Sequence, residues 1–513
     1  MESSNKRIAK NTVFLYLRMI LVMGVTLFTS RIVLQALGVE DYGLYNAVGS
    51  IVVMFAIINN MLSSGTSRFL TFELGRGDKE KLKKTFGASF AMHSAMAMFI
   101  LLLAETVGLW FLNEKMVIPA DRYVAANWLY QFSIVTCMLS LTQIPYNATI
   151  IAHERMGVYA WVGVVEVTYK LAIVYFLLYA PVPDKLILYG ALYMLWNVGV
   201  QVFYRFYCHK NFEEASITIV KDKSLYKKML SFSLWDTIGA FCATGNSQGA
   251  NILMNLFFGV TVNAARGVSY QVENAVTQFS NNFMTAVKPQ ITKLFAQERY
   301  EEFFKLIFDS AKFSYFLLFI IELPIFLEID YILSIWLVEV PPYTAMFIRY
   351  ISITRLIRAL NTPVMYGVHA TGNIKWMNLL SGGQSVLLTL PVTYILYKMG
   401  LPPQSLFWVI ILTCFLGNFF EDICLKKNLD FSILKFSKEV YLKSAMLSLL
   451  ASIPAVGIVL LMDPSFLRLI ITTIVSVASV IIVVFYLGIS QEMREKVIYV
   501  VKGKIGNKNN VRQ

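Results

Sequence analysis

The sequence predicts an all-α, polytopic membrane protein with about fourteen transmembrane helices, and three observations support this fold class. Of its 513 residues, 57% are hydrophobic and 15% are charged, whereas about 25% of residues are charged in soluble proteins. Apolar runs recur along the whole chain, and many exceed the roughly 18 residues that let a helix cross a bilayer. Lysine and arginine gather in alternate loops between these runs, as they do in multi-pass proteins.

The first predicted helix covers residues 11–36. Its apolar run is too long for a cleavable signal peptide and lacks a small-residue cleavage site, so we expect it to remain as a helix. Glycine and proline mark several of the turns that follow. The other predicted helices cover residues 43–70, 85–112, 123–152, 157–180, 186–207, 229–256, 262–290, 305–327, 343–371, 375–397, 403–424, 438–461 and 466–488.

The charge pattern predicts the orientation of these helices. With the amino terminus inside, most of the 45 lysines and arginines fall in inside segments. The outside loops hold five: Lys115, Arg122, Lys185, Lys398 and Arg468. Both termini are therefore predicted to be cytoplasmic. The net charge of +13 is accounted for by basic loops, and no basic, aromatic-rich domain indicates a nucleic-acid partner.

An internal repeat links the two halves of the chain. The turn Leu37-Gly38-Val39 matches Phe258-Gly259-Val260. The same offset pairs Asn60 with Asn281 and Lys84 with Lys305, and Pro145–Ala152 matches Pro363–Ala370 at nearly the same offset. The offset spans six helices, an even number, so the halves face the same way across the membrane.

This repeat predicts two parallel six-helix bundles followed by an appendix. The predicted parts are an N-terminal bundle at residues 1–220, a C-terminal bundle at 221–430, two extra helices at 431–490 and a basic cytoplasmic tail at 491–513. Two such bundles imply a central cleft that is lined by polar helix faces.

Two predicted helices carry long polar stripes. Helical periodicity places one set of side chains on a single face of residues 262–290, and helix 229–256 carries a similar set. The stripes either bind neighbouring helices through hydrogen bonds or line a water-filled cleft. We favour the cleft, with substrate contacts from Gln248, Asn251, Gln271, Asn274, Gln278 and Asn281.

Arginines occupy positions deep within predicted helices. Arg355 and Arg358 lie near the middle of residues 343–371, one helical turn apart, where each charge costs roughly 2.5–3.5 kcal/mol on insertion scales. That helix holds no acidic residue, so a partner must come from elsewhere, with Glu273 and Glu322 as candidates. Either the two arginines form structural ion pairs or they form an anion site facing the cleft, and we favour the anion site.

Other cations in the predicted helices have simpler explanations. Arg18 lies about seven residues into the first helix and either reaches the cytoplasmic surface or joins the cleft. Arg31 and Arg266 lie near predicted outer ends, where their side chains can extend to the interface. Lys170 follows Glu166 by four residues, a spacing that allows the two to neutralise each other.

The sequence carries no recognisable catalytic motif. There is no G-x-x-x-x-G-K-[ST], H-E-x-x-H or G-x-S-x-G sequence, and the four histidines are scattered. The five cysteines form no CxxC pair, so a metal site or a disulfide framework is not expected. We therefore predict no catalytic residues, no metal and no cofactor. A carrier with a polar, cationic cleft fits these observations better than an enzyme does.

Three stretches resemble one family of carriers. They are TSRIVLQALGVEDYGLYNAVGS…FELGRGD in the first half, AVKPQITKLFAQERYEEF in the second half and ALNTPVMYGVHATGNIKWMN after it. They resemble the polysaccharide-transporter branch of the multidrug/oligosaccharidyl-lipid/polysaccharide (MOP) exporter superfamily, whose members include Wzx-type flippases for O-antigen and capsule repeat units. The resemblance covers almost the whole chain.

The resemblance implies a MATE-like pair of bundles that alternate between inward-facing and outward-facing states in the bacterial plasma (inner) membrane. It implies a substrate, an oligosaccharide linked to undecaprenyl pyrophosphate, which moves from the cytoplasmic to the periplasmic leaflet. Membrane lipids and a polysaccharide polymerase machinery are the other implied partners. Arginines in the cleft, Arg18, Arg355 and Arg358, would then bind the pyrophosphate.

Drug antiporters of the same superfamily are the alternative. Many carry a carboxylate in their first helix for proton or sodium coupling, whereas this chain has no Asp or Glu between Asn11 and Val39. Coupling to a proton or sodium gradient stays open, with Glu273, Glu166 and Asp236 as weak candidates. A membrane-embedded glycosyltransferase or polymerase is a third, less favoured class.

Overall fold

The computed structural model describes residues 4–114, 116, 118–179, 181–216, 218, 220–337, 340–488 and 494. It describes no side chains at 26–32, 38–40, 49–62 and some neighbouring positions, so Arg31, Gly38 and Asn60 lie outside the described side chains. The predicted tail at 491–513 lies outside the described residues apart from Arg494. All regular structure in the described part is helical, which confirms the predicted fold class.

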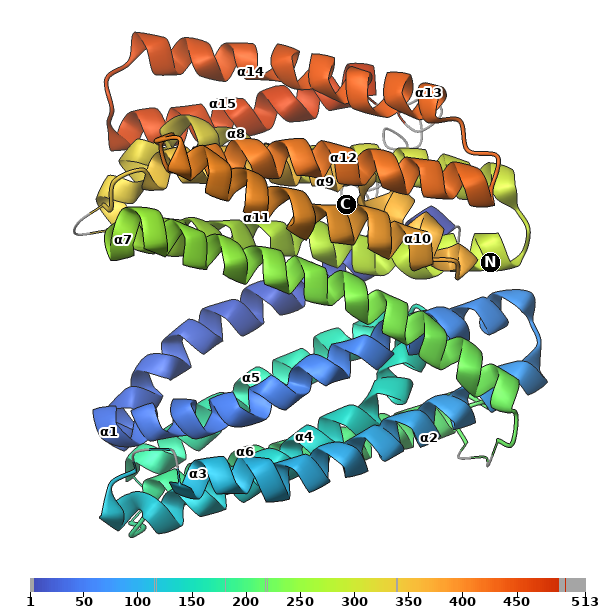
Figure 1. Cartoon of the computed structure of the whole chain (residues 1–513), viewed down its shortest axis with the longest axis vertical. Helices are drawn as coiled ribbons and strands as arrows, with labels where there is room; N and C mark the ends of the chain where they lie inside the picture. The colour runs from blue at the N-terminus through green and yellow to red at the C-terminus, as the bar shows by residue number, and fades with distance from the viewer. Residues whose placement is uncertain are drawn as a thin grey trace, which may run out of the picture. The chain divides into compact units, whose positions relative to one another are not determined.

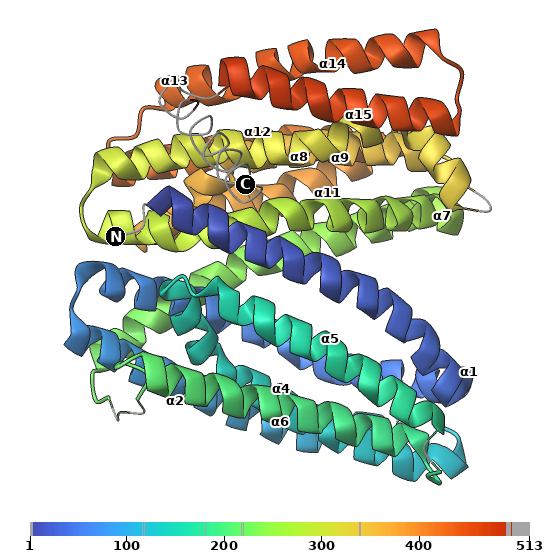
Figure 2. The ribbon, with the colours of Figure 1, turned by 180° about the vertical axis from the view of Figure 1, so that it is seen from behind.

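The described part of the first half contains six α-helices. They are α1 (Ser4–Arg76), α2 (Lys79–Leu103), α3 (Leu109–Glu114), α4 (Tyr123–Ala152), α5 (Met156–Tyr179) and α6 (Lys185–Asn211). A short π-helical segment, Ala104–Gly108, joins α2 to α3. The ribbon of α1 doubles back on itself in both views (Figures 1 and 2), so this range contains the first two predicted helices.

The described part of the second half contains nine α-helices. They are α7 (Lys223–Ala296), α8 (Tyr300–Trp336), α9 (Thr344–Thr371), α10 (Lys375–Met377), α11 (Gly383–Lys398), α12 (Ser405–Asn428), α13 (Ile433–Phe436), α14 (Lys443–Leu461) and α15 (Phe466–Val483). Helix α7 contains a kink at Gly259, where φ is +77° and ψ is −173°. Only glycine adopts this backbone region readily, and the kink falls at the predicted turn.

Fourteen helices of membrane-spanning length are therefore present in the described chain, since α1 and α7 each hold two of the predicted helices and π-helical segments join α10 to α11 and α13 to α14. Eight helices of the described part are long and apolar enough to cross a membrane by length and composition. The protein is thus a multi-pass membrane protein.

Helix boundaries differ from the predicted ones where amphipathic turns extend beyond the apolar run. Helix α2 begins at Lys79, six residues before the predicted start, because the Asp78 carboxylate accepts a hydrogen bond from the Lys81 backbone N–H at 3.0 Å and caps the helix. Helix α8 begins at Tyr300, ahead of the predicted start at residue 305. Hydropathy alone does not detect such charged helical turns.

The contacts divide the chain into two compact units. Unit 1 contains Met1–Thr237 and Thr285–Tyr300, and unit 2 contains Ile238–Met284 and Glu301–Gln513. Helix α7 therefore contributes to both units, with its first and last turns in unit 1 and its middle in unit 2. The predicted bundle boundaries stay a prediction.

Helix α4 is central to the packing of unit 1, where it contacts α1, α2 and α6. Its Tyr130 is fully buried, and the phenol donates a hydrogen bond at 2.9 Å to the carbonyl of Ala104, in the π-helical segment. In unit 2, α9 packs on α12, and α14 packs beside α15 (Figures 1 and 2). The α9–α12 contact brings together residues about sixty positions apart in the sequence.

Candidate functional site

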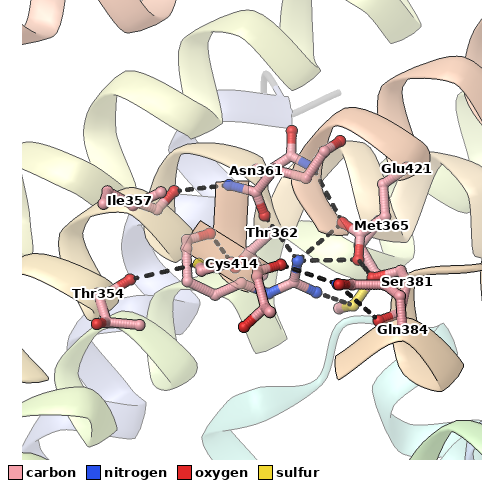
Figure 3. A network of polar contacts seen from close by, with 12 residues as sticks. Thr354, Ile357, Asn361, Thr362, Met365, Ser381, Gln384, Cys414 and Glu421 are labelled. Carbon is pink, nitrogen blue, oxygen red and sulfur yellow. Dashed lines mark hydrogen bonds and ion pairs between the residues drawn. The ribbon is translucent and has the colours of Figure 1, made fainter. Parts of the chain in front are cut away.

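A buried polar network joins α9 to α12 in unit 2 (Figure 3). The Arg358 guanidinium donates through Nη1 to both carboxylate oxygens of Glu421, at 2.8 and 2.9 Å, and to Oδ1 of Asn418 at 2.9 Å. The Glu421 side chain is 2% exposed and the Arg358 side chain 30% exposed. A charge-assisted bond of this kind is about twice as strong as a neutral one, so Arg358 is neutralised within the protein.

Three further side chains complete this network. Asn361 Nδ2 donates to Oε2 of Glu421 at 2.9 Å, and Ser381 Oγ donates to Oε1 at 3.0 Å. The Asn361 Oδ1 in turn accepts from the Tyr441 hydroxyl at 3.2 Å. The network thus ties α9 and α12 to the segments before α11 and α14. A buried network in which each member has a partner holds one geometry.

The other two arginines of α9 also lie beside carboxylates. Arg355 contacts Glu273, whose side chain is 2% exposed, while the Arg355 side chain is 37% exposed. Arg349 donates to Asp330 at 2.5 Å near the start of the helix. Glu322, the other predicted partner, instead accepts from Ser352 Oγ at 2.5 Å.

The structure therefore places Arg355 and Arg358 next to carboxylates, so any anion bound there would compete with them, and the anion site at these arginines stays a prediction. Sequence reasoning named Glu273 but missed Glu421. The available signal was an acidic residue inside the predicted helix 403–424. Its partner was hidden because hydrophobic periodicity does not reveal which helices are neighbours.

Arg266 is a buried arginine of a different kind. It is 2% exposed, so the prediction that its side chain extends to the interface is wrong. Its guanidinium contacts Oδ1 of Asn251, donates to the carbonyl of Ser247 at 3.2 Å and to the Tyr270 hydroxyl at 3.3 Å, and lies over the Tyr270 ring. All these partners are neutral. Among the described residues, no carboxylate forms an ion pair with Arg266.

The polar stripe of α7 lies on a face that the chain does not bury. Gln271, Asn274, Gln278 and Asn281 are all exposed, as is Gln248. Asn251, which is half-buried, contacts Arg266 and donates to Gln248 at 3.2 Å. The chain itself therefore leaves most of these amides unburied, and the water-filled cleft that they are predicted to line stays a prediction.

In unit 1, the half-buried Arg18 packs on α5. Its guanidinium carbon lies 5.8 Å from the centre of the Tyr159 ring. Its aliphatic stem lies against Gly163, where an added Cβ would approach Arg18 Cγ to 2.8 Å. The glycine therefore makes room for the arginine. Tyrosine stacking of this kind suits a cation within a membrane helix.

The candidate ion-coupling carboxylates all have partners. Glu166 accepts from Lys170 at 2.7 Å, which confirms the predicted pair one turn apart. Glu273 contacts Arg355. Asp236 interacts with Lys288 and accepts a hydrogen bond from the Ser64 side chain. None of the three is an isolated charge.

Asp422, which sequence reasoning missed, lies next to Glu421 in the sequence and forms no ion pair with the part of the chain that the structure describes. Its side chain lies in the protein interior, with 3% of the residue exposed, and its Oδ1 has no hydrogen-bond partner among the described residues. A buried carboxyl without a partner is costly in its charged form. Among the described residues, no group of three or more His, Cys, Asp or Glu side chains could hold a metal ion.

Comparison with known proteins identifies the fold. No protein-family model matches the chain, and no curated protein matches it. A MATE transporter in its bent conformation aligns with a TM-score of 0.70 at 12% identity, covering 86% of this chain and 97% of that one. VcmN, a MATE transporter of Vibrio cholerae in the bent form, gives 0.66 at 14% identity, covering 83% and 97%.

A third solved structure is described as a MOP superfamily transporter rather than as a MATE transporter. It is a MOP superfamily transporter from Pyrococcus furiosus, described as having a binding pocket of reverse polarity that suggests a different function. It aligns with a TM-score of 0.63 at 11% identity over 83% of this chain and 97% of that one. At these identities the likeness concerns the fold, and the chain has the fold of the MATE transporters of the MOP superfamily.

Proposed function

We propose that the protein is a flippase that moves undecaprenyl-pyrophosphate-linked oligosaccharide repeat units from the cytoplasmic to the periplasmic leaflet by alternating access. It would serve the synthesis of lipopolysaccharide, capsule or exopolysaccharide in the bacterial inner membrane, with both termini in the cytoplasm. The MATE-like fold supports a transporter, and the sequence motifs support this branch of the superfamily.

The observation that carries the proposal is the buried Arg266 with its neutral partners. A buried charge without a counter-ion is costly, and an anionic head group would supply the missing charge. Guanidinium binds phosphate oxygens through paired N–H groups and is weakly hydrated, which suits the transfer of a pyrophosphate through apolar surroundings. Arg266 thus becomes the first residue to test.

The other predicted contacts keep distinct roles in the proposal. The exposed amides Gln271, Asn274, Gln278 and Asn281 would bind sugar hydroxyls, because amides both donate and accept hydrogen bonds. Arg355 and Arg358 would bind the pyrophosphate only by sharing N–H groups with Glu273 and Glu421. Arg18, stacked on α5, is the corresponding cation of unit 1. Membrane lipids and a polymerase machinery stay proposed partners.

A cation-coupled drug antiporter remains the second candidate. The buried Asp422 favours it, since an unpaired carboxyl could take up a proton or bind a cation. Against it, Arg266 would repel a cationic drug in the same unit. The proposal assigns the protein no catalytic role.

The test measures translocation of a fluorescent undecaprenyl-pyrophosphate oligosaccharide in proteoliposomes. Wild type is compared with Arg266→Gln and with the control Arg349→Gln, whose partner Asp330 is largely exposed. Each protein is checked for folding by its thermal unfolding in detergent. We expect transport by the wild type and the control, and a loss of at least tenfold in Arg266→Gln.

Other outcomes separate the alternatives. Equal transport by Arg266→Gln would keep the flippase and remove Arg266 from the site. Failure of the wild type on several lipid-linked oligosaccharides, together with proton-driven or sodium-driven efflux of a cationic dye, would favour the antiporter. The double variant Arg355→Ala/Arg358→Ala, run beside these, tests the two paired arginines.

A further inference from the structure

Helices α4 and α7 end in the same motif. The sequences are Ala152-His153-Glu154-Arg155 and Ala296-Gln297-Glu298-Arg299. In both, the backbone N–H of the glutamate donates to the carbonyl three residues back, at 2.9 and 3.0 Å. The N–H of the arginine donates to the carbonyl five residues back, at 3.0 Å in each case. This is the Schellman ending of a helix, in which one residue adopts the left-handed conformation.

A glutamate occupies that left-handed position in both helices. Glu154 and Glu298 each have φ of +58°, a conformation that favours glycine. In the internal repeat, a glycine stands at the position that corresponds to each glutamate. The offset that pairs Lys84 with Lys305 also pairs Gly77 with Glu298, and the offset that pairs Pro145–Ala152 with Pro363–Ala370 also pairs Glu154 with Gly372. Both glycines have positive φ, +74° and +79°. Glycine would therefore satisfy the backbone at either glutamate.

The side chains of the two glutamates differ completely. Glu298 is exposed. The Glu154 side chain is 1% exposed, and it accepts from Lys293 Nζ at 2.5 Å and from Gln290 Nε2 at 2.5 Å. Both donors lie in the last turns of α7. The strained glutamate thus holds the turn between α4 and α5 against the end of α7.

The contact lies just beyond the point where α7 passes from unit 2 into unit 1. Thr285–Tyr300 belongs to unit 1, whereas the preceding turns of the same helix belong to unit 2. Helix α1 also meets this segment closely, since a Cβ on Gly75 would lie 3.0 Å from the Cα of Lys293. A helix that is shared by two units must bend, slide or detach when the units move.

We propose that Glu154, Gln290 and Lys293 form a latch that fastens the end of α7 to the α4–α5 turn and opens once in each transport cycle. The charge pattern predicts that this end of the helices is cytoplasmic. A buried ion pair holds its two elements together firmly, because removing one of its partners is strongly destabilising. The role in the cycle rests on the proposed transport function, whereas the latch itself does not.

Hydrogen–deuterium exchange of the purified protein tests the latch without any substrate. Glu154→Gly keeps the left-handed turn and removes the carboxylate, while Glu298→Gly makes the same backbone change at an exposed side chain. We expect exchange over Thr285–Tyr300 to rise at least tenfold in Glu154→Gly and to stay at the wild-type rate in Glu298→Gly. The charge swap Glu154→Lys/Lys293→Glu should restore part of the protection. Unchanged exchange in Glu154→Gly would overturn the latch.

Cross-linking tests the opening during transport. In a background without native cysteines, Glu154→Cys/Lys293→Cys is joined by a short, reducible reagent and assayed with the fluorescent undecaprenyl-pyrophosphate oligosaccharide. We expect transport to stop and to return after reduction. Wild-type transport by the cross-linked protein would reject the opening. If the uncross-linked wild type moves none of the oligosaccharide, the flippase proposal fails, while the exchange experiment still decides the latch.

Discussion

The Arg358 guanidinium and the Glu421 carboxylate form an ion pair in the interior of unit 2, with Nη1 2.8 Å from Oε1 and 2.9 Å from Oε2. Asn361 and Ser381 bind the same carboxylate. Arg358, whose charge is costly to place within a membrane-spanning helix, is thus neutralised by a carboxylate on a neighbouring helix. An ion pair of this kind is costly to break from one side only.

Glu421→Gln should therefore destabilise the protein more than removal of both charges does. We expect a loss of about 2–3 kcal/mol in the free energy of unfolding, below the value for a fully buried pair because Arg358 is 30% exposed. The double variant Arg358→Met/Glu421→Gln should recover part of this loss. Unfolding in mixed detergent micelles measures both. Additive losses in the double variant would show that the two residues are not coupled.

A second pair fastens the last helix to unit 2. Arg468 on α15 donates to Glu328 on α8, with Nε 3.0 Å from Oε1 and Nη2 2.8 Å from Oε2, and Thr472 also donates to Oε1 at 2.9 Å. The Glu328 side chain is fully buried. Removing one partner leaves the other charge without compensation.

Arg468→Ala should lower the free energy of unfolding by about 3–5 kcal/mol and loosen α15, which increases proteolysis in the 462–465 turn. The control is Lys435→Ala, whose ion pair with Glu439 is more than half exposed and worth less than about 1 kcal/mol. Equal stability of the two variants would mean that α15 is held by apolar packing instead. Limited proteolysis and micellar unfolding provide the two readouts.

Much of this architecture could be predicted from the sequence. The parts that could not be predicted were missed for one common reason. Apolar runs and turn residues predicted fourteen helices, and helical spacing predicted the Glu166–Lys170 pair, which lies within one helix. Glu421 and the burial of Arg266 were missed because both depend on which helices pack together. Periodicity places a side chain on a face of its helix but does not identify the neighbour.

Substitution by alanine should have opposite effects on stability at two glycines of α7. A Cβ on Gly239 would clash with Oδ1 of Asn378, whereas a Cβ on Gly245 would meet nothing within 4 Å. Gly239→Ala should cost about 1–3 kcal/mol through overpacking. Gly245→Ala should be neutral or stabilising by up to about 1 kcal/mol, because alanine favours the helix. Thermal unfolding in detergent compares them, and a tolerated Gly239→Ala would mean that the Asn378 side chain moves aside freely.

Replacing the adjacent carboxyls Glu421 and Asp422 of α12 by amides should also have opposite effects on the free energy of unfolding. Glu421 accepts hydrogen bonds from three neighbours, whereas Oδ1 of Asp422 has none and only 3% of that residue is exposed. Asp422→Asn removes a buried carboxyl that forms no ion pair with the described residues, and the isosteric amide fits the same space. We expect the free energy of unfolding at neutral pH to stay within about 1 kcal/mol of the wild type or to increase, since no partner is lost. A loss as large as that of Glu421→Gln would mean that Asp422 has a partner of its own in the folded protein. Measuring both variants in the same micellar unfolding series separates a carboxyl that the fold requires from one that it does not.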